Sequence, residues 1–465
     1  MLALPGSPRE APPFAPATLA QQRERFVQEL GELVRFPSIS ADPKRAPVMQ
    51  ACADWLRRHL QRLGAADARV LHAGGKPAVF GTIRGPRAAP RVLIYGHYDV
   101  QPAEPSGAWR SPPFEPSLRQ GALFGRGASD DKGQLFAHLK AVELLKQQRS
   151  GLPVSVSFFI DGEEEIGSPS LPQLFRQLAP ELGHDAAVVS DAPIVAADRP
   201  SITHTLRGDL YLELRVRGAG RDVHSGLFGG AVENAVTALS DALSRLHHAD
   251  GSIAVPDFYA DVPEVSARER AYMRRVGPAE HDVQRDAGGA RLSGESGYSA
   301  YERATIRPSL EISGLQGGYV GTGVKGVIPS TASAKLDIRL VPGQDLDRVA
   351  KVVTRHLARL LPPSLRLEVR ELMRIRPVAL DRGHPTMQAA VRAYTRAFGT
   401  PPVFLRTGGS IAAVSALSDG LGVPVVLMGF ALPDDAPHAP NEHFRLSMLE
   451  KGIQTSAAFL QEMAR

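Results

Sequence analysis

The chain has 465 residues, 43% hydrophobic and 22% charged, which is typical of a soluble globular protein and too long for one ordinary hydrophobic core, so two domains are expected. The 54 lysines and arginines barely exceed the 49 acidic residues, and without a dense basic block this balance gives no reason to expect nucleic acid as a partner. No apolar run is long enough to cross a membrane, and the only cysteine, Cys52, excludes an internal disulfide and fits a reducing, cytoplasmic location.

The N-terminal segment 1–18 is rich in proline and alanine. It lacks the basic-then-apolar order of a signal peptide, so we expect a disordered arm there. Helical spacing of apolar residues predicts amphipathic helices over Leu19–Val34 and Pro47–Leu63. Short strands are predicted near Arg69–Leu71 and Ala78–Ile83. This order favours an α/β sheet domain after the arm.

The apolar run Val92–Tyr95 predicts a buried strand that ends at Gly96 and leads into His97 and Asp99. Because residues i and i+2 of an extended chain point to the same side, the imidazole and the carboxylate can lie together at the carboxyl end of the strand. Open α/β sheets bind their ligands at that end, and a carboxylate beside a histidine supports it as a metal ligand. An isolated H-x-D pattern is more often an unrelated pair, so this interpretation depends on the motifs that follow.

The stretch Gly121–Gly133 places Asp130 and Asp131 among several glycines, just before a helix that is predicted to begin at about Gly133. A phosphate cradle is one interpretation. However, the G-x-G pattern lacks the third glycine and the lysine–serine/threonine end of a nucleotide loop. Two adjacent carboxylates at a helix start more naturally bind a cation or cap the helix.

Two further predicted strands end in acidic residues. The strand Pro153–Ile160 leads into Asp161 and the run Glu163–Glu165, and the strand Ala186–Val189 leads into Asp191. Such a cluster of negative charge is costly unless a positive group lies beside it, although a solvated acidic loop is the simpler interpretation of any single run. Three apolar strands therefore each end in a histidine or in acidic residues. This repetition is the strongest pattern in the chain.

The alternating strand Thr203–Val216 opens a region of different character. The catalytic domain is predicted over 19–207 and 385–465, with a small α+β domain inserted over 208–384. The further predicted elements are helices over Val232–Leu246, Ser266–Val276, Asp345–Leu360, Thr386–Phe398 and Ser447–Met463, a helix opened by Gly408–Ser410, and strands over Ser309–Ile312, Ser333–Leu340, Leu365–Val369, Val403–Leu405 and Val423–Leu427.

The candidate functional residues are histidines and acidic residues: His97, Asp130, Glu164, Glu165, Asp191 and His438. Such donors suit Zn²⁺, and Mn²⁺ or Co²⁺ with weaker preference. These groups exceed the three protein ligands of one catalytic zinc. They point to two metals about 3.5–4 Å apart, with a bridging carboxylate and a bridging water. One remaining carboxylate would then act as the general base.

The order of the motifs H-x-D, G-R-G-x-S-D-D-K-G, G-E-E-E-I-G-S, S-D, R-D-x-H-S-G and a late histidine resembles the dinuclear zinc peptidase and deacylase family. That family includes carnosinase-like dipeptidases, succinyl-diaminopimelate desuccinylase, acetylornithine deacetylase and aminoacylase. The resemblance covers nearly the whole chain and is greatest for the carnosinase-like cytosolic dipeptidase branch. It implies a mixed-sheet α/β catalytic domain, a phosphorylase/hydrolase-like three-layer sandwich, with an inserted α+β lid and dimerisation domain.

The resemblance also implies a role for each candidate. Two metals would be bound, one by His97 and Asp191 and the other by Glu165 and His438, with Asp130 bridging them across a cis peptide bond to Asp131. Glu164 would be the general base that takes a proton from the metal-bridging water and later gives it to the leaving amine. Asp99 would orient His97.

Substrate-binding residues are implied in and near the inserted domain. His224 would reach the partner subunit's site in a homodimer and polarise the scissile carbonyl. Arg339 would bind the free carboxylate of the substrate, together with Gly409 and Ser410 at a helix N-terminus. A surface histidine and a strand-surface arginine are the structural alternatives for His224 and Arg339.

The third acidic position is Asp191 rather than glutamate, which in this family goes with dipeptidases and aminopeptidases. The resemblance therefore implies a two-metal hydrolase of dipeptides with a free C-terminal carboxylate. A metal-dependent deacylase of N-acyl amino acids is the alternative. A non-catalytic binding protein of the same fold is a more remote one, because every expected ligand is present.

Overall fold

The computed structural model describes residues 10–465, and the chain divides into two compact units. Of the described residues, unit 1 contains 10–204 together with 380–405 and 411–465, and unit 2 contains 205–379 together with 406–410. Unit 2 is therefore inserted between parts of unit 1. The sequence pattern assigns 406–410 to the catalytic domain, but these residues pack with unit 2.

The prediction of a disordered arm is wrong from Phe14 onward. The backbone N–H of Phe14 donates to Gln454 Oε1 at 3.0 Å, its side chain is buried in the core of unit 1, and α1 begins at Pro16. Composition misses this because one buried aromatic side chain anchors a segment that is otherwise rich in proline. Residues 1–9 of the predicted arm lie outside the described residues.

Unit 1 is built on a mixed β-sheet whose strands lie in the order β1-β2-β6-β3-β7-β17-β8, with β16 paired to β8. The neighbours β6, β3, β7 and β17 are parallel, whereas β1, β2 and β8 add antiparallel pairs. The parallel strands are almost completely buried and rich in valine and phenylalanine, as expected when both faces are covered. The strands are β1 (Arg69–Leu71), β2 (Ala78–Ile83), β3 (Arg91–His97), β6 (Ser155–Asp161), β7 (Ala186–Val189), β8 (Ser201–Leu206), β16 (Val403–Thr407) and β17 (Val425–Leu427).

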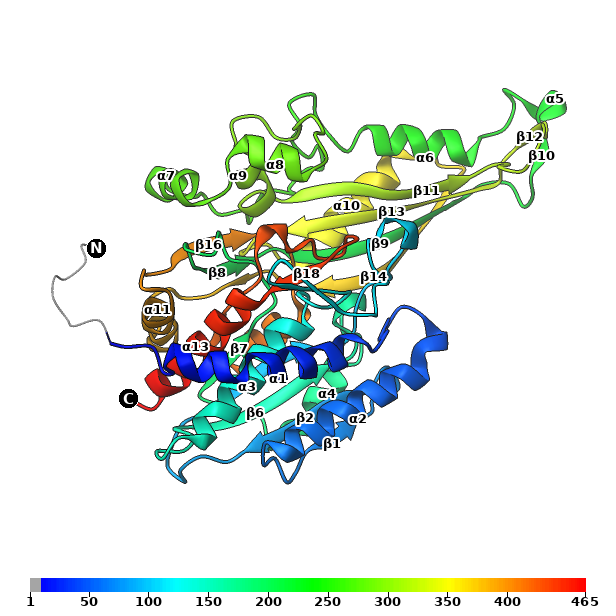
Figure 1. The fold of residues 1–465 in the computed structure, drawn as a ribbon. Coiled ribbons are helices and arrows are strands. Elements are labelled where there is room, and N and C mark those ends of the chain that lie inside the picture. The colour runs from blue at the N-terminus through cyan, green and yellow to red at the C-terminus, as the bar shows by residue number, and fades with distance from the viewer. Residues whose placement is uncertain (1–9) are drawn as a thin grey trace. The chain divides into compact units, whose positions relative to one another are not determined.

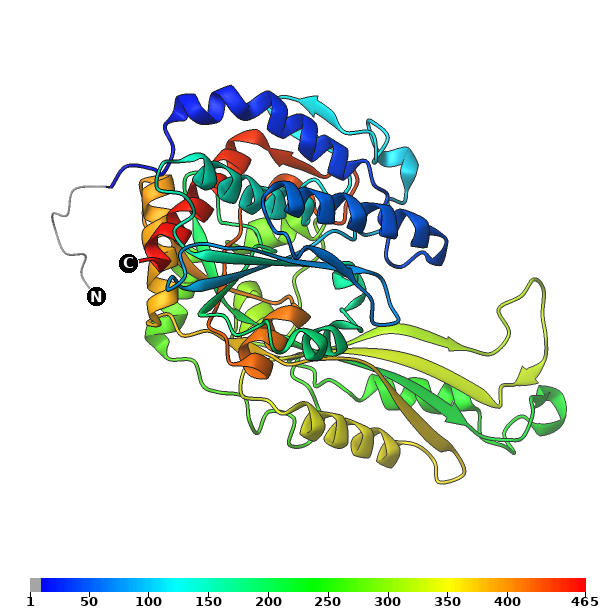
Figure 2. The same cartoon turned by 90° about the horizontal axis from the view of Figure 1, so that it is seen from below.

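Helices cover both faces of this sheet, and in Figure 2 the blue helices α1 and α2 lie on one side of it. Ile94 and Phe158 face that side and share one hydrophobic core with α1, α2, α3, α11 and α13. On the opposite face the Phe159 ring contacts Phe175 of α4, with ring centroids 5.1 Å apart. The mixed-sheet, three-layer α/β fold expected from the sequence is thus confirmed.

The helices of unit 1 are α1 (Pro16–Val34), α2 (Ala46–Arg62), α3 (Lys132–Gln147), α4 (Leu171–Leu178), α11 (Pro385–Phe398), α12 (Ala412–Ser415) and α13 (Leu446–Met463) (Figure 1). A second small sheet, in the order β18-β5-β4, joins β4 (Ser117–Arg119), β5 (Ala122–Phe124) and β18 (His443–Arg445). Across residues 10–465, none of the helices combines the length and the apolar character needed to span a lipid bilayer.

Unit 2 contains a four-stranded antiparallel sheet in the order β11-β13-β9-β14. Alternation along β9 and β13 turns residues such as Leu212 and Leu336 toward α6 and α10, while Arg339 and Asp337 lie outside that core. The elements of unit 2 are β9 (Gly208–Arg217), β10 (Val223–His224), β11 (Ser309–Gly317), β12 (Val327–Ile328), β13 (Thr331–Leu340), β14 (Arg366–Ile375), β15 (Val378–Ala379), α5 (Ser225–Phe228), α6 (Ala235–Ser244), α7 (Ala267–Val276), α8 (Glu280–Asp286), α9 (Ala300–Thr305) and α10 (Leu346–Leu360).

The single strand predicted over Thr203–Val216 is wrong, because β8 ends at Leu206 and β9 begins at Gly208. β8 is buried at every position and pairs with β17. β9 alternates and pairs with β13 and β14. The alternation belongs to β9 alone, and sequence periodicity does not reveal that the two halves join different sheets.

Candidate metal centre

The carboxyl ends of three neighbouring parallel strands meet at one edge of the main sheet. His97 ends β3 and pairs with Asp161 at the end of β6, and Asp191 lies just beyond the end of β7. Since β3 lies between β6 and β7, the polar residues that follow these strands are brought together. This is the edge at which open α/β sheets bind ligands.

The five predicted ligands form two groups that share Asp130. One group is His97, Asp130 and Asp191, the other is Asp130, Glu165 and His438, and within each group the potential ligand atoms lie within 4.8 Å of one another. Asp130 Oδ1 is 3.2 Å from His97 Nε2, and Asp130 Oδ2 is 2.9 Å from His438 Nε2. One carboxylate thus presents a separate oxygen to each group, as a bridging ligand does. The Asp130–Asp131 peptide bond is cis, as expected.

Asp99 joins the end of β3 to the acidic run that follows β6. Its carboxylate accepts the backbone N–H groups of Glu164, at 3.2 Å, and Glu165, at 3.1 Å. His97 Nδ1 lies 3.1 Å from the backbone oxygen of Asp99 and 3.4 Å from its Oδ1. With Nδ1 directed at these oxygens, the lone pair of Nε2 is left to face Asp130 and Asp191.

The acidic side chains that follow β6 point in different directions and have different roles. The Asp161 carboxylate accepts hydrogen bonds from two side-chain hydroxyls, and Glu163 accepts them from two backbone N–H groups. Both carboxylates therefore stabilise the turn. Glu165 instead points its Oε2 toward His438 Nε2 at 3.1 Å, and Gln101 Nε2 donates to the same oxygen at 2.9 Å.

Burial and mutual repulsion shift the pKa values of these groups. Burial raises the pKa of the Glu164 carboxyl well above its ordinary value, and the Asp191 carboxylate raises it further. Burial likewise raises the pKa of Asp191 to about 7. Hydrogen bonds to Asp130 and Glu165 raise the pKa of His438 to about 10. Protons therefore reduce the negative charge of the site, and a bound cation would displace them.

The donor set fits a pair of divalent cations. Within residues 10–465, the ion pairs of Asp130, Asp191 and Glu165 involve only His97 and His438. The Nε2 atom of His97 is buried and has no hydrogen-bond partner. Burying several carboxylates is costly without a compensating cation, and imidazole nitrogen with carboxylate oxygen is a donor set that Zn²⁺ accepts.

Two residues that support this site are not identified by the sequence motifs. Gln101 holds Glu165, and the available signal is that it continues the i, i+2 alternation from His97 through Asp99. Glu442 accepts the backbone N–H of Asp130 at 3.0 Å. Its only signal is that it lies in the same short segment as His438.

Unit 2 brings two of the predicted substrate-binding residues together. Arg339 Nη1 donates to Ser410 Oγ at 3.2 Å, and the Ser410 hydroxyl donates to the backbone oxygen of Arg207 at 2.7 Å. Arg339 Nε and Nη2 donate to the two oxygens of Asp337 at 2.9 and 3.2 Å, and Nη1 also lies 3.2 Å from Asp209 Oδ2. The guanidinium fork that was expected to bind a substrate carboxylate is therefore directed at Asp337.

His224 also lies in unit 2, at the end of β10, and is exposed. Its Nδ1 accepts the backbone N–H of Gly226 at 3.0 Å. In a neutral imidazole this leaves the proton on Nε2, so that nitrogen is a hydrogen-bond donor.

A helix follows Gly408–Ser410 as predicted, but it begins at Ala412 rather than at this loop: α12 (Ala412–Ser415) continues directly into a π-helix over Ala416–Gly420. The Gly409 N–H donates to Thr407 Oγ1 at 3.2 Å, within the loop itself. A Cβ atom at Gly408 would lie 2.4 Å from the backbone oxygen of Ala304. Close packing against α9, rather than a helix start, therefore explains the glycine at 408.

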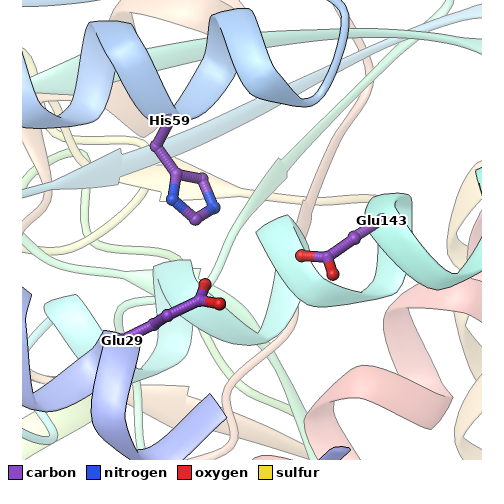
Figure 3. A group of neighbouring side chains, drawn as sticks. All are labelled: Glu29, His59 and Glu143. Carbon is purple, nitrogen blue, oxygen red and sulfur yellow. The ribbon is translucent and has the colours of Figure 1, made fainter. Parts of the chain in front are cut away.

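A third group of potential ligands, Glu29, His59 and Glu143, points inward from α1, α2 and α3 (Figure 3). The ammonium of Lys140 is fully buried, donates to both carboxylates, at 2.7 Å to Glu143, and lies 3.4 Å from His59 Nε2. Arg25 pairs with the same two carboxylates. Two cations already neutralise this group, so we assign it a structural role and no metal.

Comparison with known proteins agrees with the chemistry of the two groups that share Asp130. The model of Peptidase family M20/M25/M40 matches residues 93–462. The chain belongs to this family. The matched range contains all five predicted metal ligands, from His97 to His438. The protein is therefore a peptidase, an enzyme that hydrolyses peptide bonds, and the resemblance seen in the motifs is confirmed.

Relatives within the family cover almost the whole chain. The Cys-Gly metallodipeptidase dug1 of Schizosaccharomyces pombe is 29% identical over 459 residues and is matched over 96% of each chain. The Beta-Ala-His dipeptidase of Homo sapiens is 30% identical over 460 residues, which are 95% of this chain and 91% of the relative. The crystal structure of the M20 family metallo-carboxypeptidase Sso-CP2 from Sulfolobus solfataricus superposes with a TM-score of 0.85 at 28% identity, covering 94% of this chain and 99% of that one.

Proposed function

We propose that this peptidase is a two-metal dipeptidase that cleaves the amide bond of dipeptides with a free C-terminal carboxylate. The observation that carries the proposal is the pair of ligand groups that share Asp130. The relatives of this chain include a Cys-Gly metallodipeptidase and a Beta-Ala-His dipeptidase, which supports the same activity. His97 and Asp191 would hold one cation, Glu165 and His438 the other, and Asp130 both. Zn²⁺ is expected, with Mn²⁺ or Co²⁺ as alternatives, because the donors are nitrogen and oxygen without thiolate.

Glu164 is the proposed general base. Two divalent cations bound at this site supply Lewis acidity and lower the pKa of water from about 15.7 toward 7. Glu164 takes a proton from the attacking water and then delivers it to the leaving amine. The raised pKa of its carboxyl falls when positive charge lies nearby, so the carboxylate is available as a base at neutral pH. Asp99 holds the backbone of Glu164 and Glu165 and so fixes the base relative to a ligand.

Arg339, Gly409 and Ser410 are the proposed site for the substrate's C-terminal carboxylate. The contact between Arg339 and the Ser410 hydroxyl supports this assignment, because it holds the guanidinium, a group that donates to carboxylates, beside the loop of Gly409 and Ser410. A cytoplasmic location is proposed because the single cysteine, Cys52, is free and buried.

His224 is proposed to act in trans, in a homodimer formed through unit 2. It is exposed and its Nε2–H is available to donate to a developing oxyanion. Unit 2 also exposes several large apolar side chains, and such surfaces mark protein interfaces. They are Leu227, Phe228, Leu315, Val320 and Val324.

The proposal is tested with Glu164→Gln, which keeps the size of the side chain and removes the base. We expect the variant to retain the metal content of the wild type and to lose dipeptide hydrolysis by about 10²–10⁴-fold in kcat. The matched control is Asp434→Asn, an exposed carboxylate in the His438 segment, which should change neither quantity. A substrate panel of dipeptides, N-acetyl amino acids and longer peptides separates a dipeptidase from a deacylase or a carboxypeptidase. Preferred cleavage of N-acetyl amino acids would contradict the dipeptidase assignment.

The trans role of His224 is tested by mixing two inactive variants. Subunits carrying Glu164→Gln and subunits carrying His224→Ala are dissociated together and reassociated. If His224 serves the partner's site, each mixed dimer has one complete site, and about one quarter of wild-type activity returns. Recovery of no activity although mixed dimers form would show that His224 acts in its own subunit, and full activity of His224→Ala alone would show that it has no catalytic role.

A further inference from the structure

We propose that Glu442 is a positioning residue of the metal centre, which fixes the backbone of the shared ligand Asp130 and joins it to the segment that carries His438. This inference rests on the proposed two-metal function. Among the described residues, the hydrogen bonds to the Glu442 side chain come from Arg126 and from backbone N–H groups, none of which is a potential metal ligand, and the motifs assign it no role. Its contacts are with the loop between β5 and α3 that carries Asp130.

The carboxylate of Glu442 is completely buried and accepts four hydrogen bonds from that loop. Oε2 accepts from Arg126 Nη1 at 2.8 Å and from the backbone N–H of Gly127 at 2.9 Å. Oε1 accepts from the backbone N–H groups of Ser129, at 2.9 Å, and Asp130, at 3.0 Å. Both oxygens are thus fully engaged by one short loop.

Strand pairing explains how Glu442 reaches the loop. β5 and β18 are antiparallel, with Phe124 opposite His443. The next residue after β5, Gly125, therefore faces the residue before β18, and its N–H donates to the backbone oxygen of Glu442 at 3.0 Å. Arg126 is buried as well and donates from Nη2 to the backbone oxygen of Pro102 at 3.1 Å. Glu442 is therefore held by the sheet on one side and by a buried ion pair on the other.

Through Asp130, the position of Glu442 affects both groups of potential metal ligands. The N–H of Asp130 is fixed by Glu442, while its two carboxylate oxygens face His97 and His438. A shift of the Asp130 backbone therefore displaces an oxygen of each group at the same time. Because Arg126 neutralises the Glu442 charge, the carboxylate acts through geometry. Partners that orient a ligand in this way are worth about 10–100-fold in metal affinity.

The test compares Glu442→Gln with a buried carboxylate elsewhere in unit 1. The amide keeps one acceptor oxygen but turns an NH₂ group toward two of the four N–H donors. The control is Glu462→Gln near the end of α13, where a buried carboxylate pairs with Arg392, Arg396 and Arg465. Metal-free proteins are titrated with Co²⁺, following the visible absorption spectrum, and their thermal unfolding without metal is recorded. At saturating metal, kcat and KM are measured separately.

We expect Glu442→Gln to bind at least one Co²⁺ about 10-fold or more weakly than the wild type, with an altered spectrum. We also expect kcat to fall while KM stays within about 3-fold. Glu462→Gln should lose thermal stability and keep the wild-type affinity and spectrum.

A Glu442→Gln protein with wild-type Co²⁺ affinity and spectrum, destabilised no differently from Glu462→Gln, would show that the residue is merely structural and would overturn the inference. If that variant does not fold, Glu442→Asp decides by the same comparison, since it keeps the charge and shortens the reach. A wild-type protein that takes up no Co²⁺ would instead overturn the proposed two-metal function.

Discussion

Replacing Arg339 with methionine tests whether unit 2 recognises the substrate's carboxylate. A guanidinium has five N–H groups. In the structure Nε and one Nη2 hydrogen are directed at Asp337, and Nη1 contacts both Ser410 and Asp209. One N–H on Nη2 therefore remains for a substrate, rather than a free two-pronged fork. A hydrogen bond to a charged group is worth about 1.5–3 kcal/mol, which corresponds to a fall of about 10- to 150-fold in kcat/KM.

The assay compares a dipeptide with its C-terminal amide in wild type and Arg339→Met. We expect the 10- to 150-fold loss for the dipeptide and a loss of less than about 3-fold for the amide, because the amide has no negative charge to lose. Arg370→Met is the matched control, since Arg370 is an exposed arginine of the same sheet that pairs with Glu213. Equal losses for dipeptide and amide would show that Arg339 does not recognise the carboxylate and only supports the packing around Asp209 and Asp337.

Four other outcomes follow from the structure. Lys140→Met should lower the free energy of unfolding in urea by about 2–4 kcal/mol, because Glu29 and Glu143 lose a buried cation; an unchanged value would contradict this. Burial raises the pKa of the Glu29 and Glu143 carboxyls, but Lys140 and Arg25 lower it more, so both pKa values lie below their ordinary value. The two carboxylates therefore stabilise the fold at a pH above their unfolded pKa of about 4.3, and this stabilisation is lost as the pH falls through their lower folded pKa. Wild-type stability should consequently fall more steeply than that of Lys140→Met on acidification. Removal of metal by a chelator should abolish hydrolysis and lower Tm, and added Zn²⁺ should restore both; full activity after complete chelation would contradict the metal requirement. Gly408→Ala should raise KM by about 10-fold or more, because its Cβ would lie 2.4 Å from Ala304 O, whereas Gly420→Ala, in open space, should not.

The part of the site nearest the main sheet could be predicted from sequence because it depends on local patterns. Buried apolar strands end at His97, near Asp161 and before Asp191, and β6, β3 and β7 are neighbours. Parallel strands place such ends side by side without further information. The three-layer fold follows from the same alternation of helices and buried strands.

The remainder could not be predicted because it depends on hydrogen bonds to the backbone. Glu442 binds Gly127 across 315 residues of sequence, and backbone donors carry no side-chain pattern by which the pair could be recognised. The contacts of Asp99 with two N–H groups after β6 are hidden in the same way. The break between β8 and β9 escaped detection because strand periodicity is local, whereas the two strands pair with different sheets. The pairing of Arg339 with Asp337 could have been predicted, because residues i and i+2 of a strand lie on the same face.

The most direct test of the account is a titration of the metal-free protein with Zn²⁺ or Co²⁺, with bound metal and dipeptide hydrolysis measured on the same samples. We expect the wild type to bind two equivalents per chain and to reach full activity only as the second is bound, because both groups share Asp130. Asp130→Asn should weaken both equivalents together. Hydrolysis by metal-free protein, or saturation of activity at one equivalent, would contradict the proposal that two cations bound through Asp130 carry out the reaction.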